Sequence, residues 1–110
     1  MAAAGLDPVV ATPAHGSLDA LFVQATDDHE AGKLDAAEQA YRKILEVDPA
    51  HPEANHNLGL LAAQCGQAAA GLPFLHRAVE LDPDSAPFWT TLAESLLESG
   101  QIETLRHVEV

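Results

Sequence analysis

The six histidines and the single cysteine are the residues of this sequence best suited to metal chemistry. A zinc site needs three or four ligands that converge on one point. His51 and His56 are five residues apart, a spacing that does not place both on one face of a helix, and His29, His76 and His107 are isolated along the chain. The spacing therefore predicts no metal site.

Nucleophilic and phosphate chemistry are equally poorly supported. A catalytic cysteine needs a neighbouring base, and nothing in the sequence pairs Cys65 with one. Cys65 falls on the apolar stripe of an expected helix, so we expect a small buried residue there. Gly59, Gly66 and Gly71 do not have the spacing of a phosphate-binding loop. We expect no catalytic residues, no cofactor and no enzymatic activity.

The charge balance excludes several classes of partner. The chain has 17 Asp and Glu against 5 Lys and Arg, a net charge of −12. Nucleic-acid binding requires a basic surface that replaces counterions, and an anionic membrane surface would repel this chain. The sequence contains no apolar run of the ~18 residues that a membrane span requires, and its only cysteine allows no intrachain disulfide. We expect a cytoplasmic protein that binds neither nucleic acid nor membrane.

The composition predicts helices as the elements that position the polar residues. Alanine, leucine, Glu and Gln favour helix, whereas β-branched residues are sparse beyond the first dozen positions. Residues 1–16 contain Pro8 and Pro13 and are expected to form a disordered leader, with the helical domain at 17–110. Ser17 is the expected N-cap of its first helix.

Apolar residues at steps of three and four, together with Gly and Pro stops, delimit the expected helices. Pro73 is harmless if its helix begins by about Ala70 and introduces a kink if it begins earlier. The expected helices are 18–31, 35–47, 52–65, 68–81, 86–99 and an unfinished one from Ile102. Two of the expected buried stripes are Ala54, Leu58, Leu61, Ala62 and Cys65 in the third helix, and Trp89, Leu92, Ala93 and Leu96 in the fifth.

Residues recur at a spacing of 34 along the chain. Gly32, Gly66 and Gly100 are related by this shift, as are the pairs Asp48-Pro49 and Asp82-Pro83. A fixed period of 20–50 residues is the signature of a repeat architecture. We predict about three helix-turn-helix units at 18–51, 52–85 and 86–110, the last incomplete.

The repeated unit resembles the tetratricopeptide repeat (TPR), whose pattern is W-x2-L-G-x2-Y, then A-x3-F, then P. Small residues in this pattern let two helices approach closely, large ones fill the gaps, and the proline ends the second helix. The central unit has Asn55-x2-Leu58-Gly59-x2-Ala62, Gly71-x3-Leu75 and Pro83, the first has Leu21-x2-Gln24-Ala25-x2-Asp28, Ala37-x3-Tyr41 and Pro49, and the third has Trp89-x2-Leu92-Ala93-x2-Leu96.

This resemblance implies an all-α fold, a right-handed α-α superhelix (TPR solenoid) whose concave face is lined by the first helix of each repeat. Such modules bind peptides or protein partners and are not catalytic. Around Asn57-Leu58-Gly59 the repeat is also similar to those of bacterial proteins like O-linked N-acetylglucosamine transferase. The resemblance thus implies a scaffold or adaptor module, with a substrate-presenting module of a larger enzyme such as a glycosyltransferase and a homo-oligomerisation module as alternatives.

Register with the family places a mixture of apolar, polar and acidic residues in the concave groove. A groove of this kind suits an amphipathic or basic peptide. The acidic-tail clamp of some TPR proteins is poorly matched, because Asn57 alone among the corresponding positions has the required residue type. The predicted partner-binding groove residues are Phe22, Thr26, His29, Glu53, His56, Asn57, Leu60, Thr90 and Glu94.

The incomplete last unit predicts a further contact. Terminal units of a solenoid need a polar outer face, yet Ile102, Leu105 and Val108 are apolar. We expect self-association through the C-terminal helices.

Overall fold

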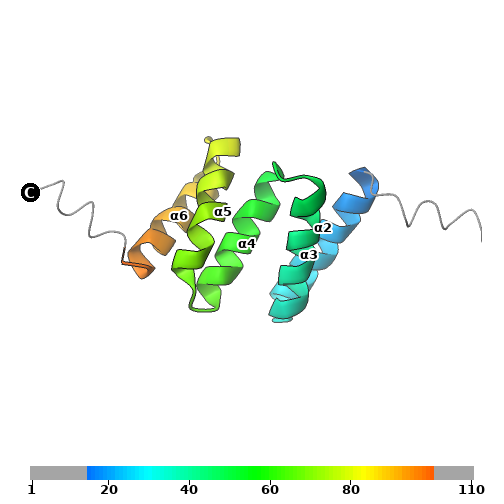
Figure 1. The fold of residues 1–110 in the computed structure, drawn as a ribbon, viewed down its shortest axis with the longest axis horizontal. Helices are drawn as coiled ribbons and strands as arrows, with labels where there is room; N and C mark the ends of the chain where they lie inside the picture. The colour runs from blue at the N-terminus through cyan, green and yellow to red at the C-terminus, as the bar shows by residue number, and fades with distance from the viewer. Residues whose placement is uncertain (1–14, 101–110) are drawn as a thin grey trace, which may run out of the picture.

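The computed structural model describes residues 15–100, and the regular structure in that range is entirely helical. The elements are α2 (His15–Glu30), α3 (Leu34–Val47), α4 (Pro52–Gln64), α5 (Ala68–Leu81) and α6 (Ala86–Glu98). α2 packs against α3 and α4 against α5, and α6 packs against both α4 and α5. Figure 1 shows the hairpins stacked side by side in chain order, with α4 in the middle. The predicted all-α superhelix is confirmed.

Glycines make the turn that follows the first helix of each repeat. Gly32, Gly66 and Gly100 all have a positive φ, of 82°, 80° and 85°. Only glycine adopts this conformation without steric cost. After α4, the amide of Gly66 donates to the carbonyl of Ala63 (3.0 Å) and that of Gln67 to the carbonyl of Ala62 (2.8 Å), as in a Schellman motif. The spacing of 34 between these glycines therefore reflects one turn made three times.

Prolines and polar caps begin the helices where the sequence predicts. Pro52 and Pro87 lie in the first turns of α4 and α6, where an amide hydrogen is not needed. The Ser85 hydroxyl accepts a hydrogen bond from the amide of Phe88 (3.3 Å), as expected of an N-cap. At the corresponding end of α4, His51 takes this role.

Pro73 lies inside α5, beyond its first turn, because the helix begins at Ala68. A proline at this position leaves the carbonyl of Ala69 without its usual donor. Both Ala69 and Pro73 are exposed, so water is available to this carbonyl. The helix consequently continues through Pro73 to Leu81.

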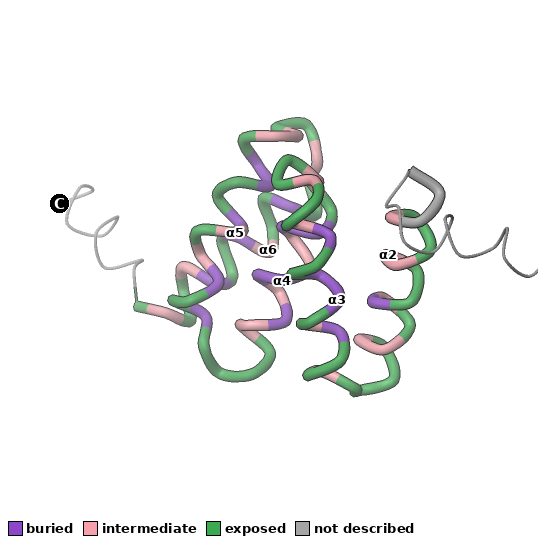
Figure 2. The backbone as a smooth tube through the Cα atoms, turned by 45° about the vertical axis from the view of Figure 1, so that its right-hand side comes forward, coloured by how far each residue is buried: buried purple, intermediate pink, exposed green. Residues whose placement is uncertain are grey.

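Two apolar clusters form the core (Figure 2). Tyr41 and Ile44 of α3 are fully buried in the first cluster, where they meet Ala25 of α2 and Leu58 of α4. Leu75 is fully buried in the second cluster, which joins α5 to α6. Each cluster is shared by neighbouring hairpins, as is expected of a solenoid.

The prediction that Trp89 lies in the buried stripe of the last helix is wrong. Trp89 is 48% exposed and Phe88 is buried in its place. The indole Nε1–H of Trp89 donates to the carbonyl of Pro83 (2.7 Å). Asn55, one repeat earlier, likewise donates from Nδ2 to the carbonyl of Pro49 (3.1 Å). The residue at this repeat position thus ties its helix to the preceding proline turn.

Two other burial predictions are also wrong. Cys65 is exposed, because it is the C-cap of α4 and lies past the last turn that packs on α5. Ala93 is exposed as well. Its equivalent in α4, Gly59, is covered by α5, and no second helix of the third repeat lies within the described range.

The expected N-terminal boundary shifts by a few residues. α2 begins at His15, so Ser17 lies inside the helix rather than at its N-cap. The rest of the predicted leader lies outside the described residues. The helix expected from Ile102 and its predicted association surface, with Leu105 and Val108, also lie outside them.

Candidate functional site

A hollow of about 410 Å³ lies between α2 and α4, on the face formed by the first helices of the repeats. The buried Tyr41 of α3 forms its floor. α2 positions its lining residues at steps of three and four, the spacing of one helix face. The lining residues are Thr26, His29, Glu30, Tyr41, Asn57, Leu60 and Gln64.

A second hollow of about 210 Å³ lies between α4 and α6. It shares Leu60 and Gln64 with the first hollow, so the two are neighbours on either side of α4. Its lining residues are Leu60, Ala63, Gln64, Thr91, Glu94, Ser95 and Glu98. We call the two hollows together the groove.

Histidines bridge the helices on both sides of α4. Nε2 of His29 on α2 lies 2.6 Å from Oε1 of Gln64 on α4. Nε2 of His56 on α4 lies 2.8 Å from Oγ1 of Thr91 on α6. Both bridges join residues 35 positions apart. Each first helix is therefore linked to the next one by a hydrogen bond.

The oxygen partners determine which ring nitrogens carry protons. The carbonyl oxygen of Gln64 only accepts, so Nε2–H of His29 donates to it and Nδ1 receives the Tyr41 hydroxyl hydrogen (3.0 Å). Oδ1 of Asn57 lies 2.9 Å from Nδ1 of His56 and also only accepts, so Nδ1–H donates. In the neutral ring Nε2 of His56 is then an acceptor, and the carbonyl of Pro87, 3.0 Å from Oγ1 of Thr91, competes with it for the single hydroxyl hydrogen of Thr91. Neutral tautomers are compatible with the contacts of both histidines.

Burial reinforces these protonation states. The pKa of the Tyr41 hydroxyl is raised above its usual value chiefly by burial, with a smaller contribution from the Glu30 charge, while a hydrogen bond from the Asn57 side chain acts in the opposite direction. The pKa of His56 is lowered, chiefly by burial and slightly by His29, against opposing contributions from Asn57 and Glu53. At neutral pH Tyr41 therefore keeps its proton and His56 is uncharged.

Acidification should destabilise the wild-type chain more than a His56→Gln variant. The lowered pKa of His56 means that the unfolded chain takes up the proton more readily than the folded chain. The stability that this contributes is complete above about pH 6.5 and is lost as the pH falls below it, through the folded-state pKa. Urea unfolding at pH 7.5 and pH 5.5 measures the difference. A matched His76→Gln change at an exposed position should leave the wild-type pH dependence in place, and an equal loss in all three proteins would contradict the assignment.

The groove is strongly acidic. Within their bounds α2, α4 and α6 contain four, one and two carboxylate residues, and none of them contains Lys or Arg. The Lys and Arg residues of the described range lie on α3, on α5 or in the turn between α2 and α3. They are Lys33, Arg42, Lys43 and Arg77. Glu30, Glu94 and Glu98 line the hollows themselves. The resulting potential attracts cationic groups and repels anionic ones.

The structure brings most of the predicted groove residues together. Thr26, His29, Asn57 and Leu60 line the first hollow, and Glu94 lines the second. His56 bridges from α4 to Thr91 of α6, and its ring stacks on Phe88, at 4.7 Å between centroids.

Four of the predicted residues line neither hollow, and His56 is one of them. Glu53 and Thr90 are exposed on α4 and α6. The half-buried ring of Phe22 packs against His51, at 5.2 Å, and Tyr41, at 6.2 Å between centroids. This ring therefore contributes to the junction between the first two repeats.

Sequence reasoning missed three residues of the first hollow: Glu30, Tyr41 and Gln64. The repeat register does contain a signal for Glu30 and Gln64. They occupy the same repeat position, 34 residues apart, and this position directly follows that of His29. Tyr41 was placed in the core by its motif position. Its ring does lie there, while its hydroxyl reaches the groove.

Within residues 15–100, no three His, Cys, Asp or Glu side chains gather as a metal site would require. No helix of the described part of the chain has both the length and the apolar character of a membrane span.

Comparison with known proteins points to one family. Tetratricopeptide-repeat family models match residues 29–51, 52–85 and 75–106. The chain is 31% identical over 101 residues to tetratricopeptide repeat protein 7A of Homo sapiens, covering 92% of this chain and 11% of that protein. It is 29% identical over 85 residues to the cellulose synthase 2 operon protein C of Komagataeibacter xylinus, covering 71% of this chain and 6% of that protein.

A solved structure shows the same arrangement of helices. It is a mutant O-GlcNAc transferase of Thermobaculum terrenum, with a TM-score of 0.78 and 34% sequence identity. The match covers 84% of this chain and 18% of that one. The chain thus spans a small fraction of the length of each of these proteins.

Proposed function

Because the chain belongs to the tetratricopeptide-repeat family, we propose that it is a non-catalytic interaction module that binds a basic segment of a protein partner in its groove. Repeats of this family generally mediate protein–protein interactions. The observation that carries the finer proposal is the groove's composition, with carboxylates on all three lining helices and no Lys or Arg among them.

The geometry of the groove favours an extended segment. The two hollows lie on either side of α4, and neighbouring helix axes are about 8–10 Å apart. An extended chain rises about 3.3 Å per residue, so side chains three residues apart would reach the two hollows. Leu60 offers an apolar contact between them, and Asn57 and Gln64 offer polar groups for the partner's backbone.

Charge reversal in the second hollow should weaken binding of a basic peptide. The double change Glu94→Lys and Glu98→Lys replaces two attractive charges by repulsive ones, and we expect the Kd to rise at least about tenfold at low salt. Titration calorimetry with Lys-rich and Glu-rich peptides of otherwise equal sequence measures the effect. The wild-type chain should prefer the Lys-rich peptide.

The control places the same charge change elsewhere. Glu80→Lys with Asp84→Lys alters exposed residues at and beyond the end of α5, which line neither hollow. This variant should bind the Lys-rich peptide with little change. Tighter binding of the Glu-rich peptide by the wild-type chain would overturn the proposal.

A second function is favoured by one comparison. The 34% identity and close superposition with the O-GlcNAc transferase support a role as the repeat module of a larger transferase that presents protein substrates to a catalytic domain. The groove would then hold the substrate rather than an independent partner. Sequencing the gene on both sides of the region that encodes residues 1–110 tests this: an adjoining glycosyltransferase domain supports it, and a complete coding sequence without such a domain excludes it.

A further inference from the structure

A depression separate from the two hollows of the groove lies on the opposite side of α4. It consists of two lobes of about 280 and 240 Å³, which share Arg42, Leu58 and Phe74. Residues of α3 line one wall, Ala70 and Phe74 of α5 line the other, and α4 provides the floor. We call the two lobes together the outer cleft. In Figure 1 α4 lies between α3 and α5.

The floor of the outer cleft is apolar. Leu58 and Leu61 of α4 form it and are almost fully buried, at 3% and 4% exposed. Leu45 and Phe74 are half-buried on the walls. Each lobe is below the range of about 300–1,000 Å³ that is usual for small-molecule pockets. The lobes are therefore better suited to single apolar side chains of a protein partner.

Arg42 divides the two lobes. Its guanidinium carbon lies 5.9 Å from the centre of the Phe74 ring, and its Nε lies 2.9 Å from Oε2 of Glu38. The Arg42 side chain is 54% exposed, and exposed pairs of both kinds are weak. An arriving partner could displace this arginine at little cost.

The wall formed by α3 is acidic. Asp35, Glu38 and Glu46 line the cleft with Arg42 as its one cation. Asp35 and Glu46 form no salt bridge with any residue of the described range. The three carboxylates lie on one helix face over 11 residues, or about 16 Å at 1.5 Å per residue. The wall formed by α5 contributes no charge to the cleft.

We propose that the outer cleft docks a basic amphipathic helix of a protein partner. Its apolar side chains fill the two lobes, and its Lys or Arg side chains face the carboxylates of Asp35, Glu38 and Glu46. A partner helix about three turns long matches the length of the acidic wall. Positions seven apart on this partner helix lie about 10 Å apart on one face, which suits two lobes at opposite ends of α3. A second copy of this chain is a poor occupant, because its net charge of −12 is repelled by the acidic wall.

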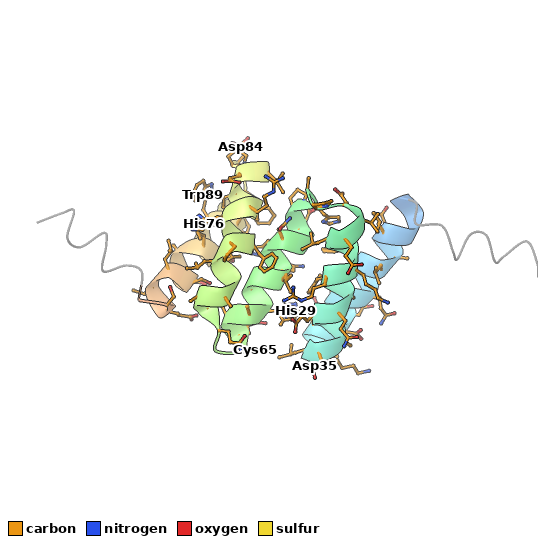
Figure 3. All side chains as sticks on the ribbon, viewed as in Figure 1. His29, Asp35, Cys65, His76, Asp84 and Trp89 are labelled. Carbon is orange, nitrogen blue, oxygen red and sulfur yellow. The ribbon has the colours of Figure 1, made fainter. Side chains whose placement is uncertain are left out.

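The chain's single thiol reports on this site. Cys65 is exposed and lines the larger lobe together with Asp35. In Figure 3 both residues lie at the same end of the helices. Alkylation of Cys65 by iodoacetamide therefore distinguishes a partner in the outer cleft from one in the groove.

The test uses a helical peptide of about 15 residues with leucines seven apart and flanking lysines, and a matched peptide with glutamates in place of the lysines. We expect the Lys peptide at saturation to slow Cys65 alkylation at least about tenfold and the Glu peptide to leave it unchanged. Asp35→Lys with Glu46→Lys should raise the Kd of the Lys peptide at least about tenfold. Glu46→Lys alone should raise the Kd of the Lys peptide about threefold. This single change should not unfold the chain, because Glu46 is exposed in the last turn of α3, where a cation is favourable.

The control separates this proposal from the groove. The groove variant Glu94→Lys with Glu98→Lys should not alter Cys65 protection or the Kd of the helical peptide. Protection that is lost in this variant, instead of in the α3 variant, would place the peptide in the groove and overturn the proposal. Equal Cys65 alkylation rates with and without the Lys peptide would overturn the proposal too.

Discussion

Gly71→Ala should lower the free energy of unfolding by about 1 kcal/mol, and by up to about 2 kcal/mol. A Cβ at Gly71 would lie 2.6 Å from the carbonyl oxygen of Gly59 and 3.0 Å from Cβ of Ala62. The first of these is a backbone atom in the middle of α4, so the contact is relieved only if α4 and α5 move apart. Overpacking of this kind costs about 1–3 kcal/mol, and it must exceed the gain of about 1 kcal/mol that alanine brings to a helix interior.

Urea unfolding measures this loss, with Ala69→Gly as the matched control. Ala69 is exposed on the same helix, two residues before Gly71. Its change to glycine removes only helix propensity and should cost about 1 kcal/mol. If Gly71→Ala left stability unchanged or raised it, the close approach of α4 and α5 would not be rigid.

Backbone features that depend on residue type alone were well predicted from the sequence. Gly59 and Gly71 were expected to mark a close approach, and the structure places each against the other's backbone. Gly32 and Gly66 were expected to end helices, and both have the positive φ that only glycine adopts readily. A residue with no Cβ, or with no amide hydrogen, restricts the backbone whatever surrounds it, which makes it legible in a single sequence.

Burial at the ends of elements was predicted less well, because it depends on neighbours that the pattern does not show. Cys65 continues the apolar spacing of α4 but follows its last turn and is exposed. Trp89 fits the family motif, yet its indole bonds to the Pro83 carbonyl at the surface. At such positions the periodicity is correct, but no element of residues 15–100 covers the side chain.

The candidate site was predicted by position but not by bonding. Register alone brought Thr26, Asn57 and Leu60 to one face, and they line one hollow. The hydrogen bond between His29 and Gln64 could not be predicted, because it depends on how far apart α2 and α4 lie. Repeat periodicity gives the order of the helices, whereas side-chain packing sets the distance between them.

Tyr41→Ala should release the first hairpin while the rest of the solenoid stays folded. Tyr41 is fully buried, and its ring packs against Phe22 and against His29, at 5.8 Å between centroids and edge to face. Replacing a buried aromatic residue by alanine costs about 3–5 kcal/mol. A solenoid is held together by contacts between neighbours, and α2 packs mainly on α3. The loss should therefore fall on α2 and α3, and native-state hydrogen exchange should show reduced protection there and retained protection in α5 and α6.

Two comparison variants make the cause specific. Tyr41→Phe keeps the ring and removes only the hydroxyl that donates to His29, so it should cost about 1 kcal/mol and leave α2 protected. Leu92→Ala at the other end of the array removes a buried contact between α5 and α6 and should expose α6 before α2.

If instead every helix lost protection equally in Tyr41→Ala, the described helices would unfold as a single cooperative unit. The groove would then be a rigid surface, because α2 could not move away from α4 without unfolding the whole. Local release of α2 and α3 would instead mean that a partner bound between α2 and α4 stabilises the first repeat, since it would hold together the weakest junction of the array.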